Sequence, residues 1–431
     1  MLDRDRIVAA YRALVEKMPS APLPCFRVVF PDGGSAAIGH GAPTFSLVVR
    51  DQDGASALGS MDGLAMAEAF MDEHLDIEGN LLAATRYAEV LNDVHPMIFL
   101  WRRLQPILLG RERVNPSWIA QHYDSGNVQL HAIDRDYDTY TPGHYAGDDD
   151  TLEAGAERKL AMAFEQLGLR PGDHLLDVGC GWGGMIRYAA RRGVRVTGIT
   201  LSTDQLTYVA ALIAREKLEA DVRHQDFFTF EPGKRFDGVT MMGVIEDLSD
   251  YRRTLHSLGR MIARGRRVYL DFAASRTRFG THSFVTRYIW PGTFRMVFMP
   301  ELMEAIRESP FELVHLTNDR RNYYLWCKGM HERWAHNRMR VEAEYGKRTW
   351  RMLALLFAGC AAMMDYPSHT VTAFRMLLEL PPDGNGIFST SRARRAADRF
   401  SSAAAVMRST AVHVGERLAG ALQTRVSPNS R

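Results

Sequence analysis

The sequence predicts an α/β protein with an open, largely parallel sheet and helices on both faces, preceded by a small α+β unit. The main support lies in residues 174–205, where an apolar run, a glycine-dense loop, a helical pattern and a second apolar run follow one another. This order is that of a βαβ unit. Further apolar runs after residue 220 extend the same sheet, and 431 residues are enough for two domains.

The glycine-dense loop is the first candidate for a binding site. Glycine allows positive φ and lets the main chain approach a ligand at the start of the next helix, where unpaired N–H groups point outward. Asp177 ends the first strand, at the edge where open α/β sheets bind ligands. The loop is therefore typical of a nucleotide site, although tight turns without a ligand also use glycine.

The residues after the second strand distinguish between classes of nucleotide. The loop has neither the GK[ST] ending of a phosphate-binding loop nor the GxGxxG of a dinucleotide site. Thr200, Leu201 and Ser202 stand where a dinucleotide site has an acidic residue, and Gln205 follows. The words LDVGCGWGG, GITLS and DQ instead resemble S-adenosylmethionine (AdoMet) methyltransferases, specifically the cyclopropane fatty acid and mycolic acid cyclopropane synthase family. The resemblance implies a Rossmann-like sheet that binds AdoMet.

Composition narrows the remaining classes of function and location. The net charge of +2 gives no overall field that would attract nucleic acid. The four cysteines form no CxxC or Cys/His metal pattern, so we expect no metal site and a reducing, cytoplasmic location. The amino terminus lacks the apolar core of a secretory signal, and the longest apolar run, Met352–Met364, is shorter than the ~20 residues that cross a bilayer.

The predicted domains are residues 1–95, a linker at 96–116, a methyltransferase domain at 117–385 and a tail at 386–431. In the first domain, runs at 26–30, 35–38 and 44–49 predict an antiparallel meander, followed by helices that include Leu64 to Phe70 and residues 81–91. The resemblance implies a lipid-associating domain here, whereas the residues alone also fit a structural cap.

Basic residues gather in the linker and in the tail. The linker arginines fit a solvated face or a contact with anionic head groups. The tail is rich in alanine, serine and arginine, and fits either a basic amphipathic helix on lipid or a frayed end.

Two segments ahead of the sheet resemble parts of the family that close over AdoMet. They are QHYDSGN at 121–127, in which His122 by itself would be a structural histidine, and YDTYTPGHY at 137–145. Tyr140 and Thr141 match a family Tyr-Ser pair for the methionine end of the cofactor. Pro142 departs from the family, which has cysteine there.

The remaining cofactor contacts follow the later strands. A helix at 204–217 and a third strand at 221–227 place Asp226 and Phe227 near adenine, although surface aspartates are common. The predicted cofactor-binding residues are Tyr140, Thr141, Asp177, Gly179, Gly181, Gly183, Thr200, Leu201, Ser202, Gln205, Asp226 and Phe227.

The candidate catalytic residues follow the fourth and fifth strands, at 236–243 and 266–273. Glu246 matches the glutamate of the family word GxFEH, and Asp247 replaces its histidine. Asp271 stands where the family has another histidine, and Tyr323, before a helix through residue 334, matches its catalytic tyrosine. In FVTRYIWP, Tyr288 and Trp290 are predicted to line an acyl channel, or else belong to the core. Residues 348–380 resemble the closing helix and strand.

An alkene is a poor nucleophile, so the enzyme must hold the sulfonium methyl in line with it, shield the resulting cation and remove one proton. The resemblance implies a bicarbonate base held by cysteine, glutamate, histidine and tyrosine. Here Pro142 and Asp271 replace two of these, which disfavours an anion, so Asp271 or Glu246 is a candidate base. Proton loss from the new methyl gives a cyclopropane, and loss from a neighbouring carbon gives the methyl- or methylene-branched alkene that we favour.

The sequence therefore predicts an AdoMet-dependent C-methyltransferase for unsaturated acyl chains of phospholipids, peripheral at the inner face of the membrane. A homodimer is left open. The alternatives are a methyltransferase for a small natural product and an inactive lipid- or AdoMet-binding homologue.

Overall fold

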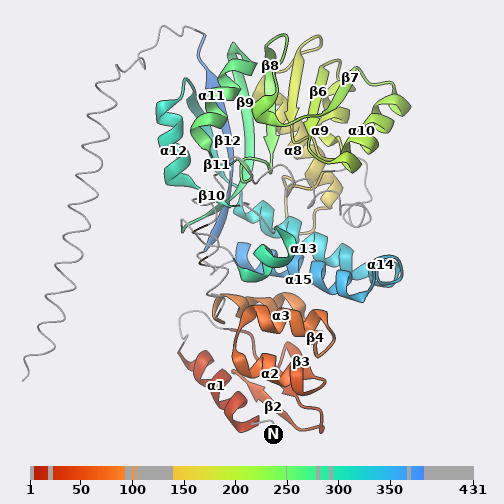
Figure 1. The fold of residues 1–431 in the computed structure, drawn as a ribbon, viewed down its shortest axis with the longest axis vertical. Coiled ribbons are helices and arrows are strands. Elements are labelled where there is room, and N and C mark those ends of the chain that lie inside the picture. Colours follow the sequence, from red (N-terminus) through yellow and green to blue (C-terminus); the bar gives the residue numbers. More distant parts are fainter. Residues whose placement is uncertain are drawn as a thin grey trace, which may run out of the picture. The chain divides into compact units, whose positions relative to one another are not determined.

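The computed structural model describes residues 4–17, 23–92, 100, 104, 139–248, 250–277, 282–290, 295–365 and 370–382. These residues all belong to one compact unit, Met1–Pro382. The QHYDSGN segment, the tail at 386–431 and almost all of the predicted linker lie outside the described residues. Figure 1 shows the arrangement of the elements.

The amino-terminal region is a small α+β unit with a four-stranded sheet in the order β2-β1-β3-β4. Its elements are α1 (Arg4–Glu16), β1 (Phe26–Val29), β2 (Ser35–Ile38), β3 (Phe45–Val49), α2 (Gln52–Ser60), α3 (Gly63–Met71), β4 (Leu75–Gly79), α4 (Leu81–Thr85) and the 3₁₀ turn η1 (Arg86–Glu89). The predicted antiparallel meander is wrong in one respect, because β1 pairs with β3 in parallel. Alternating apolar residues identify strands, but they do not determine which strands become neighbours.

The large sheet has the order β11-β12-β9-β8-β5-β6-β7, with β10 paired to β9. Its strands are β5 (His174–Val178), β6 (Arg195–Thr200), β7 (Ala220–His224), β8 (Phe236–Met242), β9 (Ile262–Ser275), β10 (Val297–Phe298), β11 (Glu312–Asn318) and β12 (Val371–Leu380). The strands from β7 to β9 run parallel, whereas β12 is antiparallel to both of its neighbours. Strand β7 ends before Asp226, which instead caps the 3₁₀ turn η2 (Phe227–Thr229).

Helices cover both faces of this sheet, as predicted. Leu176 and Leu270 pack with α11 (Tyr251–Met261) and α12 (Met299–Glu308). Their neighbours along the strands, Leu175 and Tyr269, point the other way and pack with α8 (Leu152–Leu167) and α9 (Gly184–Ala190). This alternation follows from the two-residue period of a strand, and burial on both faces explains why the strands are nearly all apolar. Helix α10 (Thr203–Glu216) also contacts β6 and β7.

The last helices form a separate aromatic cluster. Helix α13 (Arg320–His336) packs along α15 (Lys347–Met364), with α14 (Arg338–Tyr345) between them in the sequence. Trp334 is fully buried and its indole N–H donates to the Trp350 carbonyl at 3.0 Å. Within the described part of the chain, no helix has the length and apolar character that a membrane span requires.

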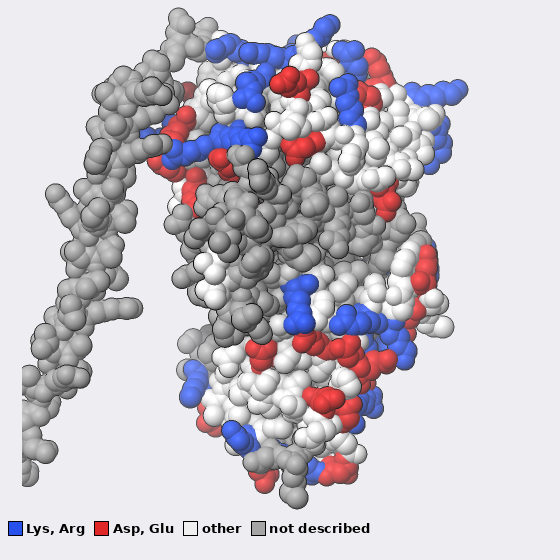
Figure 2. All heavy atoms as spheres, viewed as in Figure 1, with Lys and Arg blue, Asp and Glu red and all other residues white. Residues whose placement is uncertain are grey.

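Helix α15 also contacts the amino-terminal unit through charged groups. Arg351, 5% exposed, donates to the Phe70 carbonyl at 2.9 Å and pairs with Asp76 at 2.6 Å. At the exposed margin of this contact, Lys347 pairs with Glu73 at 3.1 Å. On the face drawn in Figure 2, acidic and basic side chains lie interspersed over the surface.

Candidate active site

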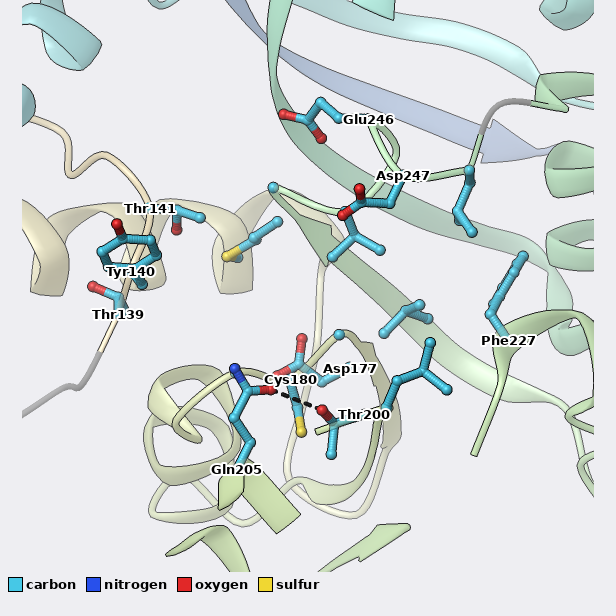
Figure 3. Close-up of a pocket in the computed structure, with 18 of the residues that line it drawn as sticks. Thr139, Tyr140, Thr141, Asp177, Cys180, Thr200, Gln205, Phe227, Glu246 and Asp247 are labelled. Carbon is cyan, nitrogen blue, oxygen red and sulfur yellow. Dashed lines mark hydrogen bonds between the residues drawn. The ribbon is translucent and has the colours of Figure 1, made fainter. Parts of the chain in front are cut away.

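A cavity of about 530 Å³ lies beyond the carboxyl ends of β5 and β8. The chain runs from β5 outward through β6 and β7 and then returns to the other side of β5 with β8, so the two strands flank a topological switch point. Open α/β sheets bind their ligands at such points. Figure 3 shows the labelled side chains around this space, with Tyr140 and Thr141 on one side, Asp177, Thr200 and Gln205 below, and Glu246 and Asp247 above.

The glycine loop after β5 forms one wall. Gly179, Gly181 and Gly183 all have positive φ, at 63°, 53° and 86°. A Cβ at Gly179 would lie 2.5 Å from a methyl carbon of Val244, whereas a Cβ at Gly181 would project into open space. Gly179 and Gly181 line the cavity, whereas Gly183 caps α9 and faces Val209 and Leu212.

The carboxyl end of β6 supplies a set of polar groups. The Thr200 hydroxyl donates to the Gln205 side chain at 2.7 Å, and both residues line the cavity beside Leu201. The Ser202 side chain accepts from the Gln205 N–H and caps α10, so it orients the helix and does not itself line the cavity. The Asp226 carboxylate accepts from the Phe228 N–H at 2.8 Å. These contacts hold the wall formed by Asp226, Phe227 and Phe228.

Tyr140 and Thr141 form the opposite wall. A Cβ at Gly243, whose φ is 66°, would meet the Thr141 methyl at 2.8 Å, so a glycine here allows the segment to lie against the end of β8. Burial raises the pKa of Tyr140 far above its usual value, and the phenol is therefore neutral. Lys159 donates a hydrogen bond to the Thr141 hydroxyl.

Glu246 is the most exceptional group in the cavity. Its side chain is 4% exposed, and one carboxyl oxygen accepts from the Ala273 N–H at 2.8 Å. The other oxygen, Oε2, has no hydrogen-bond partner among the described residues. Burial raises the pKa of Glu246 to about 8, and the nearby Asp247 and Asp271 carboxyls contribute.

Two further buried carboxyls line the cavity. Burial raises the pKa of Asp177 to about 7, although the 2.6 Å hydrogen bond from the Thr240 hydroxyl and the charge of Lys159 act in the opposite direction. Burial also raises the pKa of Asp247 to about 7. The cavity therefore combines apolar walls with carboxyls that ionise near neutral pH.

Tyr323 lies inside the first turn of α13, where the sequence placed it just before a helix. It lines the cavity together with Trp326 and Cys327, which follow on the same helix. Its pKa is raised well above the usual value, first by burial and then by charges that include Glu246. Cys360 on α15 lines the same wall and is hydrogen-bonded to Cys327. The sequence pattern indicates no role for these cysteines, which lie 33 residues apart and meet only because α13 packs on α15.

Two other predicted site residues lie outside the cavity. The Asp271 side chain is buried behind it and pairs with Lys159 at 3.3 Å. The Tyr288 hydroxyl donates to Glu68 of the amino-terminal unit at 2.6 Å, while Trp290, two residues later, does line the cavity. Tyr288 therefore stands at the contact between the two regions.

Three charged residues of the site were not predicted from the sequence: Asp250 and Arg253, which line the cavity, and Lys159, which lies behind it. The Lys159 side chain is 1% exposed and contacts both Asp271 and Thr141. A signal was present, because Lys159 falls on the buried face of α8 with Leu152, Ala156 and Ala163. A lysine among apolar helix positions requires a buried partner. Asp271 is therefore neutralised by Lys159, and it does not face the cavity as a second free carboxylate.

The residues present fit AdoMet. Gly181 leaves room where a side chain would project, Gln205 and Asp226 provide polar groups beside aromatic rings, and Glu246 offers an unpartnered carboxyl oxygen to a cationic ligand. A methionine end would be held by Tyr140 and Thr141, and an adenosine end by the residues that follow β6 and β7.

Fold and cavity together define an α/β enzyme with a Rossmann-like sheet. A family model described as mycolic acid cyclopropane synthetase matches residues 111–374, more than half of the chain, and a domain of unknown function matches residues 10–90. The chain therefore belongs to the mycolic acid cyclopropane synthetase family. The predicted family, fold class and enzyme class, an AdoMet-dependent methyltransferase, are confirmed.

Several relatives are named as lipid methyltransferases. The chain is 34% identical over 271 residues to a Mycobacterium tuberculosis protein named "Probable fatty acid methyltransferase", covering 60% of this chain and 62% of that one. A Pseudomonas putida protein with the same name is 27% identical, with 77% and 86% covered. Sphingolipid C9-methyltransferase 2 of Gibberella zeae is 23% identical, with 68% and 60% covered. The chain thus spans less than two thirds of the mycobacterial relative.

Solved structures agree on the fold. The cyclopropane synthase MmaA2 of Mycobacterium tuberculosis superposes with a TM-score of 0.56 at 20% identity, covering 62% of this chain and 99% of that one. Mycolic acid cyclopropane synthase CmaA1, complexed with SAH and CTAB, superposes with a TM-score of 0.56 at 21% identity, covering 61% of this chain and 97% of that one. At such identities the likeness concerns the fold alone.

Proposed function

We propose that the protein is an AdoMet-dependent C-methyltransferase that acts on the double bond of unsaturated fatty acyl chains in phospholipids. The observation that carries this proposal is the buried Glu246, which lines the cavity and has one carboxyl oxygen without a hydrogen-bond partner among the described residues. The names of the bacterial and fungal relatives support a lipid substrate.

The apolar wall of the cavity suits a hydrocarbon. Trp290, Trp326, Leu356 and Phe357 come from three separate segments and border the same space. Such a wall excludes water from a developing positive charge, and aromatic faces attract cations. AdoMet, when bound, would supply the electrophilic methyl group.

Glu246 is the base in this proposal. It lines the cavity, and the Ala273 N–H holds one of its oxygens, while the other has no hydrogen-bond partner among the described residues. Asp271, the other candidate, is held by Lys159 outside the cavity. A carboxylate of the protein makes a bicarbonate ion unnecessary. Tyr323, kept neutral by burial, would position the substrate cation beside Glu246 without taking its proton.

The chemistry balances with these residues. The alkene π pair forms the new C–CH3 bond, and the electron pair of the broken S–CH3 bond stays on sulfur. One C–H bond of the substrate then breaks, its electron pair forms a C=C bond or closes a ring, and the proton goes to Glu246. We propose the branched alkene as product, because Pro142 and Asp271 replace the groups that hold bicarbonate in the resembled enzymes.

Such a substrate requires contact with a membrane. We propose a peripheral association at the inner face, with the amino-terminal unit or the basic tail as the contact. Binding of the protein to vesicles of anionic phospholipid, before and after removal of residues 386–431, tests the tail's part.

The function is tested by incubating the protein with [methyl-³H]AdoMet and phosphatidylglycerol vesicles that carry cis-monounsaturated chains. We expect label in the acyl chains, none with saturated vesicles, and a loss of at least about 100-fold for Glu246→Gln, the usual range for a general base. Label transferred to a small polar acceptor but not to lipid would favour the small-molecule alternative. AdoMet binding without any transfer would favour an inactive homologue.

A further inference from the structure

The charges around the cavity are unevenly compensated. Lys159 neutralises Asp271, and Arg375 pairs with Asp319 behind the cavity wall. Glu246, by contrast, forms no ion pair with any described residue, although it is buried to a similar degree. A buried carboxylate without a counter-ion is costly, so the protein alone favours the neutral acid.

Among the described residues, the titratable groups that interact with Glu246 are Asp247 on the same loop, Asp271 on β9, Tyr251 on α11 and Tyr323 on α13, and none of these is a cation. Arg253 also lines the cavity, and its guanidinium lies over the Phe228 ring, 4.2 Å from the ring centroid. Arg295 offers only its N–H to the Glu246 carbonyl at 3.3 Å, because its guanidinium pairs with Glu301 at 2.5 Å. A base must nevertheless be ionised before it can accept a proton, and burial holds the pKa of Glu246 near 8.

We propose that Glu246 is the counter-ion of the AdoMet sulfonium, and that it releases its proton to solvent when AdoMet binds but not when the uncharged product binds. The inference rests on the proposed function, in which Glu246 is the base. Glu246 would thus be ionised, and able to accept a proton, only when the methyl donor is bound. The proton taken from the substrate would restore the neutral acid.

The physical reason is linkage between two charges. A positive charge inside a water-poor cavity stabilises an adjacent carboxylate far more than it would in water. Whatever stabilises the ionised form lowers its proton affinity, and by reciprocity the ionised form binds the cation more tightly. S-adenosylhomocysteine keeps the adenosine, ammonium and carboxylate of AdoMet and lacks only the methyl and the sulfur charge, so the difference between the two ligands isolates the sulfonium.

The test is titration calorimetry of the wild-type protein at pH 7 in buffers of different ionisation enthalpy. We expect AdoMet to release about one proton more than S-adenosylhomocysteine, because a group with a pKa near 8 is mostly protonated at pH 7. The affinity ratio of AdoMet to S-adenosylhomocysteine should rise roughly tenfold per pH unit below pH 8 and then level off. Equal proton release for both ligands would overturn the proposal.

Two variants separate Glu246 from the rest of the cavity. Glu246→Gln should abolish the difference in proton release and reduce the preference for AdoMet. Asp226→Asn, which removes a carboxyl from another wall, should weaken both ligands alike and keep the difference. If Glu246→Gln does not fold, the difference in proton release between AdoMet and S-adenosylhomocysteine on the wild-type protein is enough to test the proposal. Lipid methylation without a proton difference contradicts only this inference, and a proton difference without lipid methylation contradicts only the proposed function.

Discussion

At the scale of single residues, the Lys159–Asp271 pair shows how the chain accommodates a buried carboxylate on β9. Both side chains are almost fully buried, and Lys159 also holds the Thr141 hydroxyl of the cavity wall. A pair of this kind contributes little net stability compared with apolar residues, but it makes each partner depend on the other.

Lys159→Met should therefore lower the free energy of unfolding by about 3–5 kcal/mol, because it leaves Asp271 buried and unpaired. The double variant Lys159→Met/Asp271→Asn should recover much of this loss. Urea unfolding measures the free energy of unfolding of the single and the double variant. Lys328→Met, which breaks an exposed pair with Glu332, is the matched control and should cost under about 1 kcal/mol. Equal losses for the two lysines would show that the buried pair has no special role.

Gly181 offers a second test at this scale. Gly181→Ala forces a Cβ into the cavity at a positive φ, whereas Gly172→Ala imposes similar backbone strain, at a φ of 92°, in a turn that does not line the cavity. Each should cost roughly 1–2 kcal/mol of stability. Only Gly181→Ala should also weaken AdoMet binding, by about tenfold or more, as measured by calorimetry. Comparable affinity in both variants would place the cofactor elsewhere.

Many site residues could be predicted because they sit at fixed offsets from strand ends. Asp177, Thr200 and Glu246 each follow or end a parallel strand, and such ends meet at one edge of the sheet. Lys159 and Cys360 could not be placed in this way. They lie on helices, and a helix position reveals burial but not which cavity its side chain reaches.

At the scale of elements, the parallel strands and the first three amino-terminal strands could be predicted, whereas β4 and the parallel pairing of β1 with β3 could not. Strands β5, β6 and β8 are buried along nearly their whole length and are separated by helical patterns, which is characteristic of a sheet covered on both faces. Strand β4, with the sequence LDIEG, carries too few apolar residues to stand out. Helix α2 contains Gly54, although glycine disfavours helix. A Cβ at this position would lie 2.0 Å from the His74 carbonyl oxygen, so the close approach of that carbonyl requires glycine here.

The contact between α15 and the amino-terminal unit gives a prediction at this scale. Arg351→Met removes a buried pair with Asp76 and a hydrogen bond to the Phe70 carbonyl, and should cost about 2–4 kcal/mol of stability. Lys347→Met removes an exposed pair at the same contact and should cost under about 1 kcal/mol. Thermal melts compare the two. A larger loss for Lys347→Met would mean that the exposed margin, and not Arg351, holds the regions together.

At the scale of the whole molecule, the buried carboxyls should make stability depend on pH. Glu246, Asp177 and Asp247 have raised pKa values of about 8, 7 and 7, so the folded state binds more protons than the unfolded state above pH ~4. The stability that these carboxyls contribute is fully present below their pKa values in the unfolded chain and is lost as pH rises through 7 to 8. Histidines with lowered pKa values act in the opposite direction, but only below about 6.5; they are His144, His174 and His331.

The melting temperature of the cofactor-free protein should therefore fall between pH 6.5 and pH 8. Saturating AdoMet should flatten this slope, because its charge stabilises ionised Glu246. Glu246→Gln should also flatten it in part. A melting temperature that rises over this interval would contradict the assignment of neutral carboxyls to the cavity.

We propose that this fold transfers a methyl group to an acyl double bond, with Glu246 as the base. The most direct test is to express the protein in a host without its own cyclopropane synthase and to analyse total fatty acids by mass spectrometry before and after mild hydrogenation. We expect chains that have gained one CH2 and still take up hydrogen, and we expect none when Glu246→Gln is expressed. Chains that gain CH2 but resist hydrogenation would be cyclopropanes and would contradict the branched product, and unchanged fatty acids would contradict the claim itself.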